Sequence, residues 1–528
     1  MYSLLGNGVA MDSEKEILKL NNYIKNLETE LHVLHETVDY LTRKLYGPRS
    51  EKTATLTNAV DDKQISMFDE AETSADENVA EPGLKDVQSY RRKKFKGQRA
   101  ELLKDLPRKK RLCTLAEEDL FCETCGHDLV SVGEEFIRTE IQFIPAKVEV
   151  IDYYRASYEC RTCRKNDKPY IENSPMPYPV IQHSMASPST VAWVAHQKFV
   201  NAMPLYRQEK EWQMVGVKLS RATMANWLMV ATRDWLMPIL DLMHQRLLEQ
   251  THLHADETPL QVLKEPGRKN TTKSYMWIYG TGKNSLEPIR IFQYQPGRQA
   301  QHPEKFLKEF KGYLHTDAYS GYNKIPYVVR CMCWAHLRRK FVDALPKNVK
   351  DQGETLAGQG IAYCNQLFKI EKDLESLECK KERKAKRLEL EQPILDAFWS
   401  WIDETKASNT ILPKEKLAKA INYAQNHKQE FMNYLEDGDC VISNNQAENA
   451  IRPFTIGRKN WLFSGSPKGA DTSAALYSII ETAKANGLVP FKYLEFIFKE
   501  LPGVQFHRHP EFLEEFLPWR EEVQHFCK

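Results

Sequence analysis

The chain has 528 residues, of which 42% are hydrophobic and 10% aromatic, values that exclude a largely disordered protein. Its length predicts several domains rather than one continuous core. The formal net charge of +2 hides a local asymmetry, because residues 50–88 carry ten acidic and three basic side chains whereas residues 89–112 carry two and eleven. Since neither a secretory leader nor an apolar run of about 18 residues is found, we expect a cytoplasmic protein with no membrane partner.

Residues 12–46 are expected to form a coiled coil. Their apolar residues alternate three and four positions apart over four heptads: Ile17, Leu20, Ile24, Leu27, Leu31, Leu34, Val38, Leu41 and Leu45. This seam predicts a homodimer or higher oligomer, although a helix docked on its own protein would show the same stripe. Residues 47–112 are expected to be a flexible linker, first acidic and then basic. Its basic clusters either neutralise DNA phosphates or are simply solvated.

A zinc-binding ribbon is expected at residues 113–175. Two Cys-x-x-Cys pairs can supply the four thiolates of a structural Zn²⁺ site, and they are Cys122, Cys125, Cys160 and Cys163. The β-branched and aromatic residues between the pairs are typical of strands. Two alternatives remain: thiols without metal, or a site in which Cys113 or His127 replaces one ligand.

Residues 186–245 are expected to be helical. Gly216 and Ser220 interrupt two amphipathic runs, and Ser220 is a suitable N-cap for the second. This pattern is compatible with a DNA-binding helix-turn-helix and equally with plain helical packing.

The order of elements after residue 250 is the most informative part of the sequence. Strands are predicted at 251–256, 274–281 and 288–294, a helix at 301–310, strands at 312–317 and 327–333, and a helix at 336–344. This order predicts a ribonuclease H-like core whose first part covers residues 248–344, in a multidomain α+β protein. In that fold the first and fourth strands are neighbours, so Asp256 and Asp317 should be close in space.

Glu448 is the third candidate acid. It follows an expected helical insertion at 345–440 and lies near the start of a helix in the second part of the core, residues 441–488; a C-terminal segment, 489–528, follows. Three carboxylates, with no histidine or cysteine expected to bind the metal directly, point to Mg²⁺ or Mn²⁺, and two such ions can activate the attacking oxygen and stabilise the leaving oxygen in phosphodiester transfer. Glu257 should point to the other side of its strand and play a structural part.

Basic and aromatic residues follow Glu448. Bases contact phosphates and aromatic rings stack on unpaired nucleobases, so we expect DNA contacts from Arg452, Arg458, Lys459 and Trp461. Phe454 and Phe463 are expected to be core residues. A second zinc site at Cys331, Cys333 and His336 is disfavoured, because one strand and one helix cannot supply four converging ligands. Instead, His336 is expected near the acids in a supporting role.

Several of these segments resemble the insertion-sequence sixty-six family of bacterial DDE transposases, TnpC type. The resemblance spans nearly the whole chain and is carried by the residues around Asp256 (His254 to Thr258), Asp317 (Thr316 to Tyr322), His336 (Cys333 to Phe341) and Glu448 (Asn444 to Trp461). It implies an Asp/Asp/Glu transposase that acts on the terminal inverted repeats of its own element with small accessory proteins. The basic segment before the cysteines is less glycine-rich than the resemblance implies. DNA contact by this segment is therefore the family property that the sequence supports least.

The sequence therefore predicts a DNA transposase that cleaves and transfers strands with divalent metal ions. Two alternatives stay open: a zinc-dependent DNA-binding regulatory protein, and a nuclease of the same fold that only hydrolyses DNA.

Overall fold

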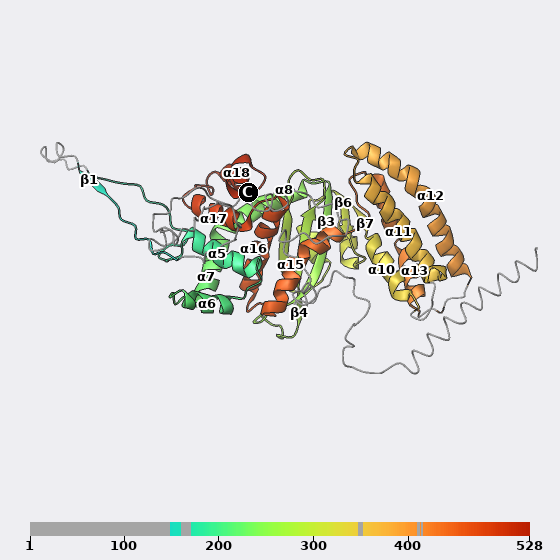
Figure 1. Cartoon of the computed structure of the whole chain (residues 1–528), viewed down its shortest axis with the longest axis horizontal. Helices are drawn as coiled ribbons and strands as arrows, with labels where there is room; N and C mark the ends of the chain where they lie inside the picture. Colours follow the sequence, from blue (N-terminus) through green and yellow to red (C-terminus); the bar gives the residue numbers. More distant parts are fainter. Residues whose placement is uncertain (1–147, 160–170, 347–351, 409–411, 413–414) are drawn as a thin grey trace, which may run out of the picture. The chain divides into compact units, whose positions relative to one another are not determined.

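The computed structural model describes residues 148–159, 171–346, 352–408, 412 and 415–528 (Figure 1). The predicted coiled coil at 12–46, the linker at 47–112 and the four candidate zinc ligands lie outside these residues. Within the predicted ribbon the structure describes two short antiparallel strands, β1 (Ser157–Glu159) and β2 (Ile171–Asn173). None of the helices in the described ranges is both long and apolar enough to cross a membrane.

A five-stranded mixed sheet lies at the centre of the described chain, in the order β5-β4-β3-β6-β7. Its strands are β3 (His252–Gln261), β4 (Lys273–Thr281), β5 (Arg290–Gln295), β6 (Gly312–Thr316) and β7 (Val328–Met332). β3, β4 and β5 pair antiparallel, whereas β6 pairs parallel to both β3 and β7. The strands expected from the sequence are all present, and β3 runs five residues further than its pattern indicated.

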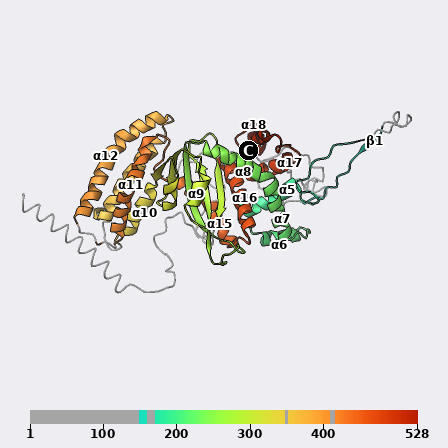
Figure 2. The same ribbon diagram turned by 180° about the vertical axis from the view of Figure 1, so that it is seen from behind.

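Helices cover both faces of the sheet, which explains why β4 is buried almost throughout. Figure 1 shows α15 (Asn445–Trp461) crossing one face, and Figure 2 shows α9 (Gln301–Phe306) on the other. Phe306 of α9 stacks on Tyr279 of β4 with 3.9 Å between ring centroids. At the edge strand β5, hydroxyls of α16 (Pro467–Ala485) accept backbone N–H groups, Ser478 from Phe292 at 2.7 Å and Thr482 from Arg290 at 3.0 Å. The exposed backbone of the edge is thereby partly satisfied.

Helices before and after the sheet pack together around the same core. The first group is α5 (Pro188–Phe199), α6 (Leu205–Met214), α7 (Arg221–Ala231), a π-helical turn (Thr232–Leu236) and α8 (Met237–Leu248). Ser220 caps α7 as expected, since its hydroxyl accepts the Thr223 N–H at 3.1 Å. The C-terminal helices are α17 (Pro490–Glu500), which packs on α5, and α18 (Glu521–Cys527).

The chain between β7 and α15 is helical, as the sequence indicated, and has its own core. It consists of α10 (Trp334–Ala344), α11 (Leu356–Leu374), α12 (Lys380–Ala407), α13 (Lys416–Asn426) and α14 (Lys428–Met432). Arg387 of α12, 1% exposed, pairs with Glu371 at 2.6 Å. Its guanidinium also donates to three carbonyl oxygens of the segment returning to α15, those of Tyr434 at 2.9 Å, Asp437 at 3.0 Å and Cys440 at 3.0 Å.

Candidate active site

Asp256 and Asp317 are brought together by the parallel pairing of β3 and β6. The two strands pair in the register His254 with His315. Two residues further along each strand, this register puts Asp256 beside Asp317, the residue that directly follows β6. Because neighbouring strands lie about 4.8 Å apart, the two carboxyl groups reach a common space.

Glu448 is held near the two aspartates by hydrogen bonds of Asn444, which precedes it by one helical turn. Asn444, 1% exposed, lies at the start of α15. Its side chain accepts a hydrogen bond from His254 Nδ1 at 3.0 Å and donates to the Ala255 carbonyl at 2.9 Å. Both partners belong to β3 directly before Asp256, so the first turn of α15, with Glu448, is held against that part of the strand.

The three acids interact electrostatically. Burial, the largest cause, and the charges of Glu257, Asp317 and Glu448 together raise the pKa of Asp256 to about 8, against the opposing effect of a hydrogen bond from the Glu257 N–H. That N–H donates to Asp256 Oδ1 at 2.8 Å. Negative groups gathered in this way favour a bound cation, which would offset both their repulsion and their desolvation. The residues present therefore fit a divalent metal ion.

Glu257 has separate partners. Its carboxylate accepts hydrogen bonds from Arg298 Nε at 2.7 Å and the Tyr322 hydroxyl at 2.6 Å, and its side chain is 1% exposed. Arg298 also lies 4.0 Å from Asp317 Oδ2 and rests on the ring of Tyr319. These contacts agree with the structural part expected for Glu257.

Two basic residues of α10 flank Glu448. His336 Nδ1 is 3.6 Å from Glu448 Oε1, and Arg339 Nη2 is 3.8 Å from Glu448 Oε2. His336 thus lies beside the acids, where the sequence placed it, whereas Arg339 was not singled out, since basic residues on helices are common surface features. Burial lowers the pKa of His336, and the charge of Glu448 opposes that effect.

Two buried cysteines, Cys331 in β7 and Cys333 directly before α10, face different neighbours. Cys333 accepts the Asn444 N–H at 3.1 Å, and its thiol lies near His336 and Glu448. Cys331 instead faces Cys440, with 4.0 Å between their sulfur atoms, near His315. His315 is engaged through both ring nitrogens, to the Leu253 carbonyl and the Val441 N–H. Because the two cysteines diverge, the structure brings Cys331, Cys333 and His336 into no common site.

The four residues expected to contact DNA differ in their surroundings. Arg452 and Lys459 are exposed on α15. Arg458 donates to the Thr258 hydroxyl at 3.1 Å and to the Pro259 carbonyl, both in β3, and burial lowers its pKa. Trp461 is partly buried and packs edge-on against Phe199. Arg458 and Trp461 therefore have contacts within the protein that the sequence did not reveal.

Phe454 and Phe463 differ in their exposure to solvent. Phe454 is 1% exposed and belongs to the core, as expected. The same expectation for Phe463 is wrong, because its side chain is 43% exposed. Phe463 follows Leu462, whose positive φ of 66° ends α15 and turns the chain outward.

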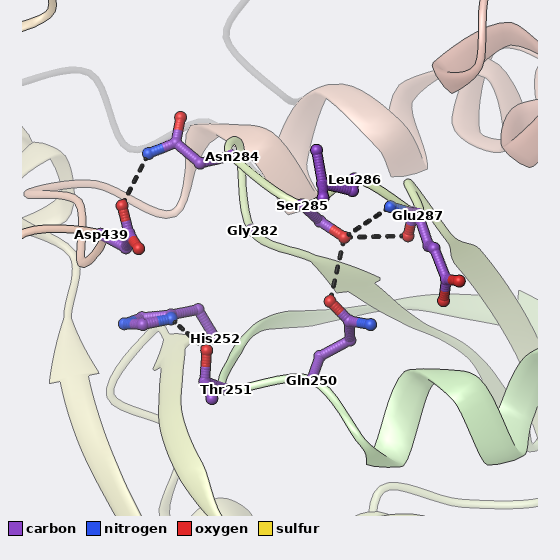
Figure 3. A pocket seen from close by; sticks show the side chains of 9 residues that line it. All are labelled: Gln250, Thr251, His252, Gly282, Asn284, Ser285, Leu286, Glu287 and Asp439. Atoms are coloured by element: carbon purple, nitrogen blue, oxygen red, sulfur yellow. Dashed lines mark hydrogen bonds between the residues drawn. The ribbon is translucent and has the colours of Figure 1, made fainter. Parts of the chain in front are cut away.

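A separate hollow of about 360 Å³ lies where β3 begins (Figure 3). His252, Asn284 and Asp439 line it, and Asn284 donates to Asp439 Oδ1 at 2.9 Å. Asp256, Asp317 and Glu448 are not among its lining residues. The hollow is therefore distinct from the cluster of three acids.

Comparison with known protein families shows to which family the chain belongs. The family described as "Transposase IS66 family" matches residues 183–472, more than half of the sequence, and this range includes all three acids and the helical insertion. The chain belongs to the IS66 transposase family. Membership implies transposase or nuclease activity, with DNA as the partner.

Three further models of the IS66 family cover other parts of the chain. The "zinc-finger binding domain of transposase IS66" matches residues 119–164, which contain all four candidate zinc ligands, and supports a structural zinc. The "IS66 C-terminal element" matches residues 478–519. "Transposase C of IS166 homeodomain" matches residues 33–111, a range that includes part of the expected coiled coil at 12–46 and nearly all of the expected linker at 47–112.

Curated relatives of this IS66 family member come from Sinorhizobium fredii (strain NBRC 101917 / NGR234). Uncharacterized protein y4qI is 30% identical over 505 residues, covering 91% of this chain and 87% of the relative. Uncharacterized protein y4hP is 28% identical over 504 residues, with the same coverage. Uncharacterized protein y4jD is 27% identical over 502 residues, covering 92% of this chain and 94% of the relative.

Proposed function

We propose that this protein is a DDE transposase that cleaves the terminal inverted repeats of its own insertion sequence and joins the freed ends to target DNA. Asp256, Asp317 and Glu448 are its catalytic residues and bind two Mg²⁺ or Mn²⁺ ions. The observation that carries the proposal is the convergence of these acids: the β3–β6 register makes Asp256 and Asp317 neighbours, and Glu448, nearly 200 residues after Asp256, is close enough for its charge to raise the pKa of Asp256.

The strand order supports a ribonuclease H-like core. Three antiparallel strands are followed by two parallel ones, with helices on both faces, and Asp256 lies on β3 while Asp317 directly follows its partner strand β6. Glu448 joins them from the first turn of α15. Carboxylate ligands suit Mg²⁺ and Mn²⁺, which bind through a few acids together with substrate phosphate.

The proposed reaction has two chemically similar steps. Water first attacks a phosphodiester at the element end and leaves a 3′ hydroxyl; that hydroxyl then attacks a target phosphodiester, forming one P–O bond and breaking another. Bound divalent ions would lower the pKa of the attacking oxygen and stabilise the leaving oxygen. The protein's own contribution is to hold the three carboxylates in register, through β3–β6 pairing and the Asn444 anchor, before DNA arrives.

DNA recognition is assigned to several regions. The zinc ribbon and the α6–α7 pair would bind the element ends, and the exposed Arg452 and Lys459 lie on the helix that carries Glu448, where they can reach phosphates. The N-terminal coiled coil would pair two chains, and small accessory proteins would join the complex. Arg458 and Trp461 are weaker candidates for direct DNA contact because of their internal partners.

The deciding experiment uses the full-length protein and DNA carrying the element's own ends. Wild-type protein should nick the ends and transfer them into a target plasmid only when Mg²⁺ or Mn²⁺ is present. Asp317→Ala should abolish both steps while binding of the ends persists. Full activity of Asp317→Ala would refute the mechanism. Nicking without strand transfer by the wild-type protein would identify a nuclease. Binding of the ends without nicking by the wild-type protein would identify a DNA-binding regulator.

A further inference from the structure

The carboxylate of Glu448 faces an imidazole without forming a hydrogen bond to it. His336 Nδ1 and Glu448 Oε1 are 3.6 Å apart, and each of these atoms is buried with no hydrogen-bond partner among the residues that the structure describes. Buried polar atoms are nearly always satisfied, so a pair left facing one another calls for a third group between them.

The separation of the two atoms discriminates among candidates for that third group. A bridging water lies about 2.8 Å from each of its partners. Because the nitrogen and the oxygen are only 3.6 Å apart, the nitrogen–water–oxygen angle would be unfavourably small. Nitrogen and oxygen ligands of a divalent transition ion lie about 2.1 Å from the ion, so a 3.6 Å gap fits two ligands of one cation. A cation is therefore the better fit.

We propose that His336 is a ligand of the catalytic cation that Glu448 binds. The inference rests on the proposed function and extends it, because the cation site then contains an imidazole as well as carboxylates. Imidazole favours Mn²⁺ and other transition ions over Mg²⁺, which prefers oxygen ligands. The protein should accordingly bind Mn²⁺ more tightly than Mg²⁺, and His336 should be the source of that preference.

The other neighbours of Glu448 are compatible with this role. Arg339 approaches Oε2 and leaves Oε1, the oxygen nearer His336, free of hydrogen bonds. Cys333 lies within reach of the same pair, and its sulfur accepts the Asn444 N–H at 3.1 Å. His336 and Glu448 lie on separate elements, α10 and α15, so a shared cation would also join the helix that follows β7 to the helix that carries Glu448.

The competing explanation is an ordinary ion pair, and the chain contains a matched example of one. His427 Nδ1 lies 3.6 Å from Glu430 Oε1, with side-chain exposures of 23% and 31%, compared with 27% and 26% for His336 and Glu448. Glu430 lies in α14 and His427 is the residue that precedes this helix, and the two belong to no group of three potential ligands in the described part of the chain. His427→Ala therefore controls for the loss of a half-buried histidine beside a glutamate.

The test is direct cation binding by the zinc-loaded, full-length protein without DNA. Calorimetric titrations with MnCl₂ and MgCl₂ should show that His336→Ala weakens Mn²⁺ binding about tenfold or more and Mg²⁺ binding much less. His427→Ala should change neither, and His336→Asp should retain Mg²⁺ binding while losing the preference for Mn²⁺. Equal weakening for both ions, or none, in folded His336→Ala would overturn the proposal.

A measurement on the wild-type protein guards against misfolded variants. Pulsed electron paramagnetic resonance detects a nitrogen bound directly to Mn²⁺, and this signal should be present in wild type, persist in His427→Ala and vanish in His336→Ala. His252→Ala must also keep it, because His252, Asp437 and Asp439 form a separate group that could bind a cation. Absence of the wild-type signal, despite Mn²⁺ binding, would refute His336 as a ligand.

Glu448→Ala separates this inference from the function on which it rests. If Glu448→Ala abolishes Mn²⁺ binding and His336→Ala does not, the catalytic acids stand and the histidine ligand is wrong. If Glu448→Ala leaves Mn²⁺ binding intact, the proposed role of the acids fails together with the inference.

Discussion

The side-chain oxygen of Asn444 lies 3.0 Å from Nδ1 of His254, a residue 190 positions earlier in the chain. The same side chain donates to the carbonyl of Ala255, next to Asp256. One buried amide therefore sets the position of Glu448 relative to Asp256, and several expectations depend on it.

Replacement of Asn444 by alanine should reduce both stability and activity. It removes two hydrogen bonds and leaves the Ala255 carbonyl and a buried imidazole unpaired, at a cost of about 3 kcal/mol. Urea denaturation measures the loss of stability. The rate of DNA strand cleavage reports whether Glu448 has been displaced from the other two acids. The exposed neighbour Asn445 supplies the control, since Asn445→Ala should change the free energy of unfolding by less than about 0.5 kcal/mol. Equal effects of the two substitutions would disprove the anchoring role.

Asp256→Asn should stabilise the protein when divalent cations are removed with EDTA. The pKa of Asp256 is about 8 in the folded protein, mainly because of burial, against about 3.9 for an unfolded chain. Since folding favours the protonated carboxyl, stability of the wild type should fall as pH rises from about 4 to about 8, by up to about 1.4 kcal/mol per pH unit. The asparagine variant lacks this loss, so its advantage should grow through that window and vanish near pH 4.

The measurement is the melting temperature of both proteins across that pH range. Saturating Mn²⁺ should raise the melting temperature of the wild type at pH 8 and have a smaller effect on Asp256→Asn. A wild type that is as stable as the variant at pH 8 in EDTA would contradict the proposed charge cluster.

Arg458 and Lys459 are adjacent in sequence but should respond differently to substitution. Arg458→Ala loses hydrogen bonds to Thr258 and Pro259 and should lower stability by about 1–2 kcal/mol. Lys459→Ala should leave stability unchanged, weaken DNA binding and reduce by about one the slope of log affinity against log salt concentration. Salt titrations of DNA binding, together with thermal melts, test both. The assignment fails if Lys459→Ala alters melting but not the salt slope.

The zinc ribbon gives a prediction about metal content. Cys122→Ser should lower zinc, measured by atomic emission on purified protein, by about one ion per chain, because a four-ligand structural site rarely survives loss of a thiolate. Cys379→Ser is the control, since Cys379 is an exposed free cysteine in the described chain. Unchanged zinc in Cys122→Ser would exclude this cysteine as a ligand.

The sequence predicted the strands of the central sheet well because their hydrophobic runs are bounded by clear turns. Asp256 and Asp317 were locatable in the same way, since strand order alone makes their strands neighbours. Glu448 could be placed only by local context and resemblance, because its position depends on contacts between Asn444 and β3 that span about 190 residues. Such side-chain contacts have no periodic signature in the sequence.

The individual roles of surface residues were harder to predict for a related reason. Arg458 and Lys459 look equivalent in a basic segment, yet the helix turns one toward β3 and the other to solvent. Phe463 has a large apolar side chain of the kind expected in the core, but the positive φ at Leu462 directs the chain outward. Arg339 gave no signal because its importance depends on Glu448, over 100 residues away.

The guanidinium of Arg387 has a consequence for the order of folding. It holds three carbonyl groups of the segment that leads into α15, so that segment is fixed only after α12 has packed. The pairing of β3 with β6 closes a loop of about 60 residues, whereas docking of Glu448 closes one about three times longer. Longer loops cost more entropy to close, so the two aspartates should meet early and the glutamate should arrive late. A nascent or partly folded chain would thus hold two of its three acids together and still be unable to cut DNA.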